Sequence, residues 1–146
     1  MSSKRIAFAF AAVLWVVWGL VHMLAGGMIM SSPAATAFAN IADATDPNLY
    51  ALDYPDAVGA VLNQHGWNLL WIGLTTLVCA RFVWRGEGWA IGLAALTGGL
   101  ADVGYFLFLD LGGHVNFLPG TLMTIFSASA IALSVGAWMR ARANDS

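Results

Sequence analysis

Four long apolar runs occupy most of this 146-residue chain, and they constrain the fold more than any other feature of the sequence. A run of about 20 apolar residues is long enough to cross the hydrocarbon core of a membrane as one helix. The composition agrees, because 60% of the residues are hydrophobic, only 10% are charged and the mean hydropathy is +0.74. Soluble domains rarely reach such values. The sequence therefore predicts an all-α integral membrane protein with a single membrane domain over residues 1–146.

The predicted transmembrane helices cover residues 6–30, 55–84, 89–111 and 120–139. Residues 31–54 form the one long connection, an outer loop that we expect to be partly helical around residues 34–42. The other connections are short, which favours an antiparallel four-helix bundle.

Local signals set the expected helix ends and contacts. Pro55 suits an early helical position, with Asp53 as a cap upstream of it. Gly112 and Gly113 form a glycine stop signal after the third helix. Small residues on the third and fourth helices would allow close helix contact. They are Gly92, Ala95, Gly98, Gly99 and Gly104 on the third helix, and Ala128, Ala132 and Gly136 on the fourth.

The basic residues give the orientation. All six flank the apolar runs on one predicted side, and they are Lys4, Arg5, Arg81, Arg85, Arg140 and Arg142. The positive-inside rule places that side, and with it both termini, in the cytoplasm. We therefore expect a multi-pass protein of a bacterial inner membrane, surrounded by the lipid bilayer. The net charge of −2 and the lack of a basic stripe argue against nucleic acid as a partner.

Polar side chains of three predicted helices fall at a similar depth in the membrane. His22 lies sixteen residues after Ile6, and His65 lies sixteen residues before Arg81. At 1.5 Å per residue, both lie roughly 24 Å above the cytoplasmic interface. Asp102, counted from the turn before the third helix, lies roughly 21 Å above it. The sequence thus predicts one polar layer near the outer face of the membrane.

Asp102 is the most informative residue of this layer, because a carboxyl group inside an apolar run must be neutralised, paired or bound to a cation. No lysine or arginine is available at its depth. His22 and His65 are therefore candidate partners, and His114, in the loop after the third helix, is a weaker one. The side chains predicted to line the site as cofactor-binding residues are Trp18, Asn68 and Tyr105.

Neutral imidazoles together with a carboxylate suit a transition metal such as copper, zinc or iron. Our leading hypothesis is a metal site formed by His22, His65, Asp102 and His114. If the protein is an enzyme, a metal-dependent redox or hydrolytic reaction on a lipophilic or periplasmic small molecule would fit. No catalytic residue is assigned. The single cysteine, Cys79, excludes an internal disulfide and a CxxC motif.

Two other interpretations remain open. The chain could be a non-catalytic scaffold that forms a homo-oligomer, with the His–Asp layer serving as internal hydrogen bonding. It could also be a haem- or quinone-binding electron carrier, since two histidines at one depth meet the minimum for axial haem ligation. Haem ranks below a bare metal, because the chain offers one such histidine pair and no candidate ligands for a second haem. The lack of a CxxCH motif excludes covalent c-type attachment.

Overall fold

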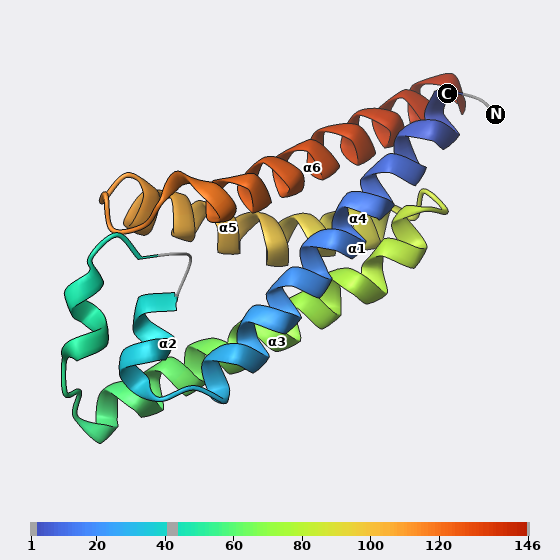
Figure 1. Ribbon diagram of the computed structural model, residues 1–146. Coiled ribbons are helices and arrows are strands. Elements are labelled where there is room, and N and C mark those ends of the chain that lie inside the picture. Colours follow the sequence, from blue (N-terminus) through green and yellow to red (C-terminus); the bar gives the residue numbers. More distant parts are fainter. Residues whose placement is uncertain (1–2, 41–43, 146) are drawn as a thin grey trace.

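The computed structural model describes residues 3–40 and 44–145 of the protein, and this part of the chain is helical with turns and no strand (Figure 1). Its helices include four that are long and apolar enough to cross a membrane, and these span Ser3–Met30, Asp56–Val83, Gly88–Asp110 and Gly120–Ala143. The protein is thus a multi-pass, all-helical membrane protein, as the apolar runs predict. All four spans agree with the predicted bounds to within a few residues.

The elements follow one another in a simple order. The first span is α1 (Ser3–Met30), followed by α2 (Ala34–Asn40) and the short 3₁₀ helix η1 (Pro47–Ala51). The second span is α3 (Asp56–Val83), and the last is α6 (Phe117–Asp145), which has a non-helical residue at Leu118. The helix α2 confirms the helical segment expected near residues 34–42, of which residues 41 and 42 lie outside the described part.

The third span is not a uniform α-helix. It consists of α4 (Gly88–Ala94), the π-helical turn η2 (Ala95–Gly99), α5 (Leu100–Tyr105) and a second π-helical turn, η3 (Phe106–Asp110). Single π-helical turns within helices are rare and often occur at functional sites. The six-residue α5, with a π turn on either side of it, carries Asp102.

The ends of the spans depend on local backbone conformation. Pro55 precedes the first helical residue of α3, and no side chain caps that end, so the predicted Asp53 cap is wrong. Gly113, with φ of 71°, follows the third span, as the glycine stop signal predicts. Gly86, with φ of 79°, allows the tight turn between α3 and α4. Both values lie in the left-handed region that glycine adopts without steric cost.

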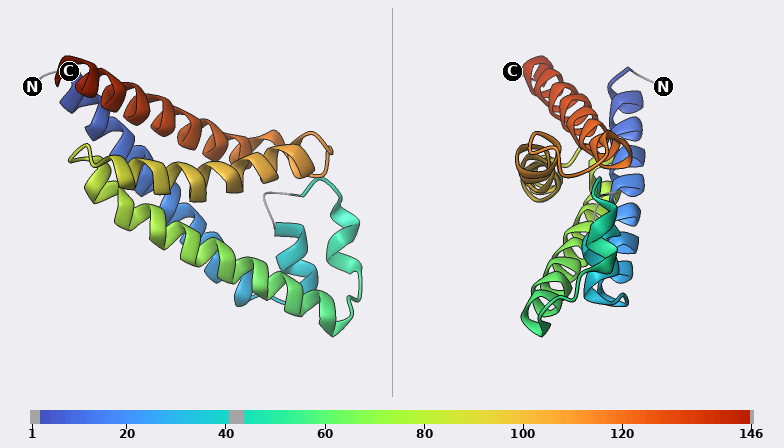
Figure 2. Two further views of the ribbon diagram at one scale, coloured as in Figure 1. Left: turned by 180° about the vertical axis from the view of Figure 1, so that it is seen from behind. Right: turned by 60° about the vertical axis from the view of Figure 1, so that its left-hand side comes forward.

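The long helices form two pairs (Figures 1 and 2). Helix α1 lies along α3, while α6 lies along α4 and α5, and α1 also contacts α6. The pairs meet at the end that holds both termini and the α3–α4 turn, which we call the basic end because Lys4, Arg5, Arg81, Arg85, Arg140 and Arg142 lie near it. They diverge toward the opposite end, which we call the loop end. There α2, η1 and the loop after η3 meet, and Ala44 pairs with Val115 in a β-bridge.

Helices α1 and α3 approach closely because glycines face one another at two levels. A Cβ atom added to Gly19 would lie 2.7 Å from the carbonyl oxygen of Gly73, and one added to Gly73 would lie 2.6 Å from that of Gly19. Gly26 and Gly66 form the same reciprocal contact one heptad away. Small residues permit such close packing between membrane helices.

The small residues predicted to bring the third and fourth spans together do so only in part. A Cβ atom added to Gly99 would lie 2.9 Å from Cδ1 of Ile131 on α6, so the two spans approach closely there. A Cβ atom at Gly92, Gly104 or Gly136 would meet no atom within 4 Å. These three glycines therefore face open space in the described structure, so the prediction is wrong for them and is confirmed at Gly99. The glycine periodicity that matters is the seven-residue spacing of Gly19 and Gly26 on α1 and of Gly66 and Gly73 on α3.

We expect the Gly26→Ala substitution to destabilise the protein by about 1–3 kcal/mol, the usual cost of overpacking. The added methyl group would lie 2.9 Å from the backbone nitrogen of Leu70 and closer still to the carbonyl oxygen of Gly66. The neighbouring Gly27→Ala is the matched control, because its methyl group meets nothing within 4 Å. In the control, the temperature of thermal unfolding in detergent should be unchanged or slightly higher. Equal losses in both variants would contradict the close glycine contact.

Candidate functional site

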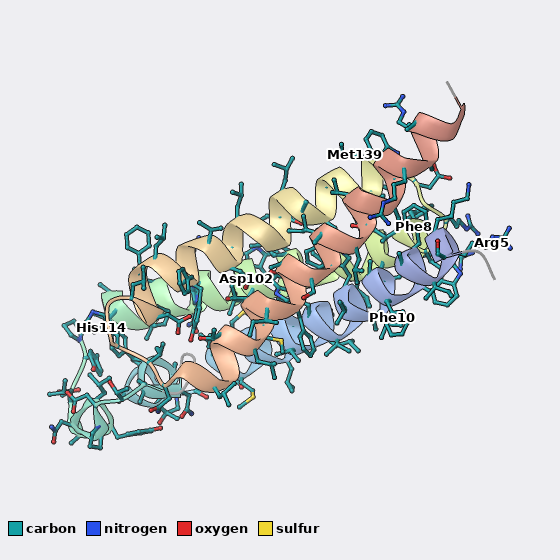
Figure 3. The ribbon with its side chains drawn as sticks, turned by 90° about the horizontal axis from the view of Figure 1, so that it is seen from above. Arg5, Phe8, Phe10, Asp102, His114 and Met139 are labelled. Atoms are coloured by element: carbon teal, nitrogen blue, oxygen red, sulfur yellow. The ribbon has the colours of Figure 1, made fainter. Side chains whose placement is uncertain are left out.

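The carboxyl group of Asp102 lies inside the protein, with 4% of the residue exposed. Its Oδ2 atom accepts a hydrogen bond of 2.8 Å from the indole Nε1 of Trp18, a residue that is completely buried. Because Trp18 belongs to α1 and Asp102 to α5, this bond joins the two helix pairs. Figure 3 shows Asp102 near the middle of the molecule, well away from both ends.

His22 lies one helical turn beyond Trp18 and faces the same carboxyl group. Its Nδ1 is 2.8 Å from the carbonyl oxygen of Trp18, and its Nε2 is 3.9 Å from Oδ1 of Asp102. The imidazole also stacks on the indole, with ring centroids 3.6 Å apart and an angle of 18° between the planes. Trp18 therefore holds both polar partners, Asp102 through its side chain and His22 through its carbonyl group and its ring.

The hydrogen bond to Trp18 determines which nitrogen of His22 carries a proton. A carbonyl oxygen can only accept, so Nδ1 must be the donor. In the neutral imidazole, Nε2 is then an acceptor, and it points toward Oδ1 of Asp102 across 3.9 Å. This separation is too long for a direct hydrogen bond. Two acceptor atoms that face each other in a buried place favour a proton or a cation between them.

Helix α6 supplies a third neighbour of the carboxyl group. The Ser127 hydroxyl hydrogen-bonds to Asp102, and it also lies 3.1 Å from the carbonyl oxygen of Thr124. Since a hydroxyl has one proton, Ser127 can donate to only one of the two at a time. Its only signal in the sequence is the helical spacing of polar residues in an apolar run, which places Thr121, Thr124 and Ser127 on one face. We did not predict it as a site residue.

His65 lies near this group but does not join it by a hydrogen bond in the described structure. It is close enough to His22 for the two imidazoles to interact electrostatically. It shares a face of α3 with Ile72 and Cys79, at intervals of seven residues. Cys79 is buried and Ile72 partly buried, whereas His65 is exposed, because the helix pairs have diverged at its level.

His114 lies in the loop at the far end of the molecule (Figure 3), so the structure does not bring it to Asp102. It is exposed, its backbone nitrogen donates to the carbonyl oxygen of Leu109, and its carbonyl oxygen accepts from the nitrogen of Thr45. These contacts connect the loop to the outer segment. Among the predicted metal ligands, His22 and Asp102 are thus brought together, His65 lies nearby, and His114 is separate.

The predicted lining residues other than Trp18 have different neighbours. The side-chain oxygen of Asn68 accepts a hydrogen bond of 3.1 Å from the Trp71 indole, on the exposed surface of α3. Tyr105 is partly buried and packs against the start of α6, where any side chain at Gly120 would collide with the phenol ring.

A second carboxyl group, which we did not predict as a site residue, is held between the third and fourth spans. Oδ2 of Asp110, at the end of η3, accepts a hydrogen bond of 2.9 Å from the hydroxyl of Thr121 on α6. Asp110 is partly exposed, whereas Asp102 is buried. This bond therefore fastens the two spans near the loop end and does not extend the buried site.

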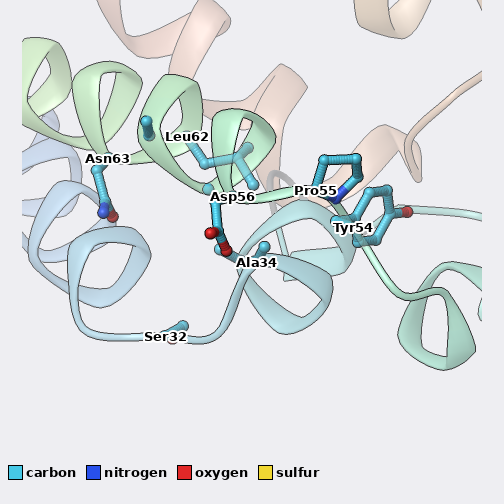
Figure 4. A pocket seen from close by; sticks show the side chains of 10 residues that line it. Ser32, Ala34, Tyr54, Pro55, Asp56, Leu62 and Asn63 are labelled. Atoms are coloured by element: carbon cyan, nitrogen blue, oxygen red, sulfur yellow. The ribbon is translucent and has the colours of Figure 1, made fainter.

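A cavity of about 410 Å³ lies at the loop end, between the segment after α1 and the start of α3 (Figure 4). Its walls include Ser32, Tyr54, Asp56 and Asn63. All the predicted site residues are described by the structure, and none of them lines this cavity. Within residues 3–40 and 44–145, moreover, there is no group of three or more His, Cys, Asp or Glu side chains close enough to hold a metal ion.

Comparisons with known proteins add no functional information. No family model matches the sequence, and searches of curated proteins and of solved structures gave no match. The function must therefore be inferred from the residues themselves.

We expect Trp18→Phe to destabilise the protein by about 1–3 kcal/mol more than Trp15→Phe, because only the first leaves a buried acceptor unsatisfied. Trp15 is a matched control. It is also completely buried on α1, and its indole nitrogen has no hydrogen-bond partner among the described residues. Thermal unfolding in detergent measures the difference. Equal losses of stability in the two variants would show that Trp18 contributes only packing and that its hydrogen bond to Asp102 does not stabilise the fold.

Proposed function

We propose that this protein binds a transition metal ion, copper, zinc or iron, inside a bacterial inner membrane, with His22 and Asp102 as the central ligands. The observation that carries the proposal is the pair of acceptor atoms, His22 Nε2 and Asp102 Oδ1, that face each other across 3.9 Å in a buried place. Zinc binds imidazole nitrogen at about 2.0–2.1 Å and carboxylate oxygen at about 2.0–2.2 Å. One zinc ion could therefore bind both atoms at these distances, from a position slightly off the line that joins them.

The groups behind the two ligand atoms also suit a metal. Histidines that bind a metal nearly always donate their other ring N–H to a carbonyl or carboxylate, and ligating carboxylates are themselves hydrogen-bonded. His22 donates through Nδ1 to the carbonyl oxygen of Trp18, and Asp102 accepts from the Trp18 indole. Both side chains are thus already oriented, which lowers the entropic cost of binding.

His65 would complete the site from α3. Its side chain must turn toward His22 to do so, and the divergence of the helix pairs leaves it exposed and able to move. We do not include His114, which lies at the loop end. The proposal accordingly differs from the sequence-based hypothesis by one ligand.

The orientation in the membrane belongs to the same proposal. The basic residues gather at the end that holds both termini, so the positive-inside rule places this end in the cytoplasm. The four spans would then form an antiparallel bundle whose helix pairs open toward the periplasm. The His22–Asp102 pair would lie below that opening, within reach of a periplasmic ion or small molecule.

The scaffold alternative is supported by a different observation. Trp18 already satisfies one oxygen of Asp102, and the resulting bond connects the helix pairs without any ion. In that case a proton would occupy the space between His22 and Asp102, and the site would be purely structural. A haem site finds no comparable support, because His65 is exposed whereas His22 is mostly buried.

Elemental analysis of the full chain, purified without a histidine tag and loaded with zinc, copper(I) or iron(II), should find about one ion per chain. We expect His22→Ala and Asp102→Asn to abolish this binding and His65→Ala to weaken it. His114→Ala is the matched control and should retain the full metal content, because His114 lies outside the proposed site. An absorption spectrum of the same sample would reveal haem.

Three results would contradict the proposal. A loaded wild-type protein without stoichiometric metal would favour the structural role, as would an Asp102→Asn variant with unchanged metal content. A loss of metal in His114→Ala equal to that in His22→Ala would place the site at the loop end instead.

A further inference from the structure

We propose that the groove between α1 and α6 at the basic end binds an anionic phospholipid. A cavity of about 450 Å³ lies there, and its walls combine charged and apolar side chains. The complete lining consists of Ser3, Lys4, Ala7, Ala132, Leu133, Gly136, Ala137 and Arg140. This site is separate from the His22–Asp102 pair and does not depend on metal binding.

The charges of the groove suit a phosphate group. Lys4 comes from the start of α1 and Arg140 from the end of α6, so the chain brings two cations from opposite ends of the sequence to one cavity. Among the residues whose side chains the structure describes, no carboxylate lines the groove. Two cations at the boundary of a membrane attract anionic headgroups, and such basic sites between helices are typical of anionic lipid binding.

The apolar wall of the groove suits an acyl chain. Leu133 lies seven residues before Arg140 on α6, which places it roughly 10 Å deeper in the membrane. Between them, a Cβ atom added to Gly136 would meet no atom within 4 Å, so the wall is hollow at that point. Ala7 and Ala132 are equally small. A lipid could therefore place its phosphate between the two cations and one chain along α6.

This combination distinguishes a lipid from a free anion. Inorganic phosphate would use only Lys4 and Arg140, and it would gain nothing from the apolar wall. A zwitterionic lipid would use the wall, but its headgroup carries a cation of its own. An anionic phospholipid such as phosphatidylglycerol satisfies both parts of the groove, and it is the ligand we assign.

Native mass spectrometry of the full chain in detergent can test this assignment, with phosphatidylglycerol and phosphatidylcholine of identical acyl chains as the probes. We expect preferential binding of phosphatidylglycerol. At about 1 kcal/mol for each basic residue, the Lys4→Ala/Arg140→Ala double variant should bind it about thirtyfold more weakly. The matched control is Arg81→Ala/Arg85→Ala, which removes the same charge at the same end but outside the groove, and it should retain most of the binding.

A second pair of variants tests the apolar wall without changing the charge. Gly136→Leu would fill the groove and should also weaken phosphatidylglycerol binding. Gly92→Leu places the same side chain on α4, at a position that is equally open, and should have no effect. Thermal unfolding of each variant verifies that it is folded.

Several outcomes would overturn the assignment. Equal binding of the two lipids, or an equal loss in the Arg81→Ala/Arg85→Ala control, would show that the groove does not select an anionic headgroup. Complete displacement of the lipid by millimolar inorganic phosphate would show that it is an anion site alone. Unchanged binding in Gly136→Leu would show that the acyl chain lies elsewhere.

Discussion

The buried carboxyl group of Asp102 is the constraint on which the rest of the structure depends. A carboxyl group in the membrane interior is tolerated only with partners, and the described chain offers no lysine or arginine at that depth. Trp18 supplies a hydrogen bond, His22 faces the other carboxyl oxygen, and Ser127 adds a hydroxyl from α6. Since these partners belong to α1 and α6, satisfying one carboxyl group holds both helices against the third span.

The surrounding architecture makes this arrangement possible. The glycine contacts of Gly19 with Gly73 and of Gly26 with Gly66 hold α1 against α3, while Trp15 and Trp18 fill the space between the helix pairs. Beyond Asp102 the pairs diverge, and His65, on the same face of α3 as the buried Cys79, becomes exposed. The His22–Asp102 pair therefore lies where the packed interior ends and the opening between the helix pairs begins. His22 is consequently only slightly exposed.

Much of the fold follows from the sequence, because the length of an apolar run nearly fixes the bounds of a membrane span. Depth counting likewise placed His22 and Asp102 in one layer. It could not show that Trp18 is the main partner of Asp102, since an indole in an apolar run looks like ordinary packing. The π-helical turns on either side of α5 could not be predicted either, because they produce no distinctive pattern of apolar residues in the sequence. His114 was grouped with the site because the sequence does not show the path of the loop that carries it.

The most direct test of the central claim is the protonation of the His22 imidazole, measured by ¹⁵N NMR on protein labelled at histidine, before and after addition of zinc. A proton should occupy Nδ1 before zinc is added, where it donates to the carbonyl oxygen of Trp18. Nε2 should be the nitrogen whose resonance shifts when zinc binds, and the Asp102→Asn substitution should abolish that shift. A proton on Nε2 with a bare Nδ1, or an Nε2 resonance that zinc does not change, would contradict a metal site between His22 and Asp102.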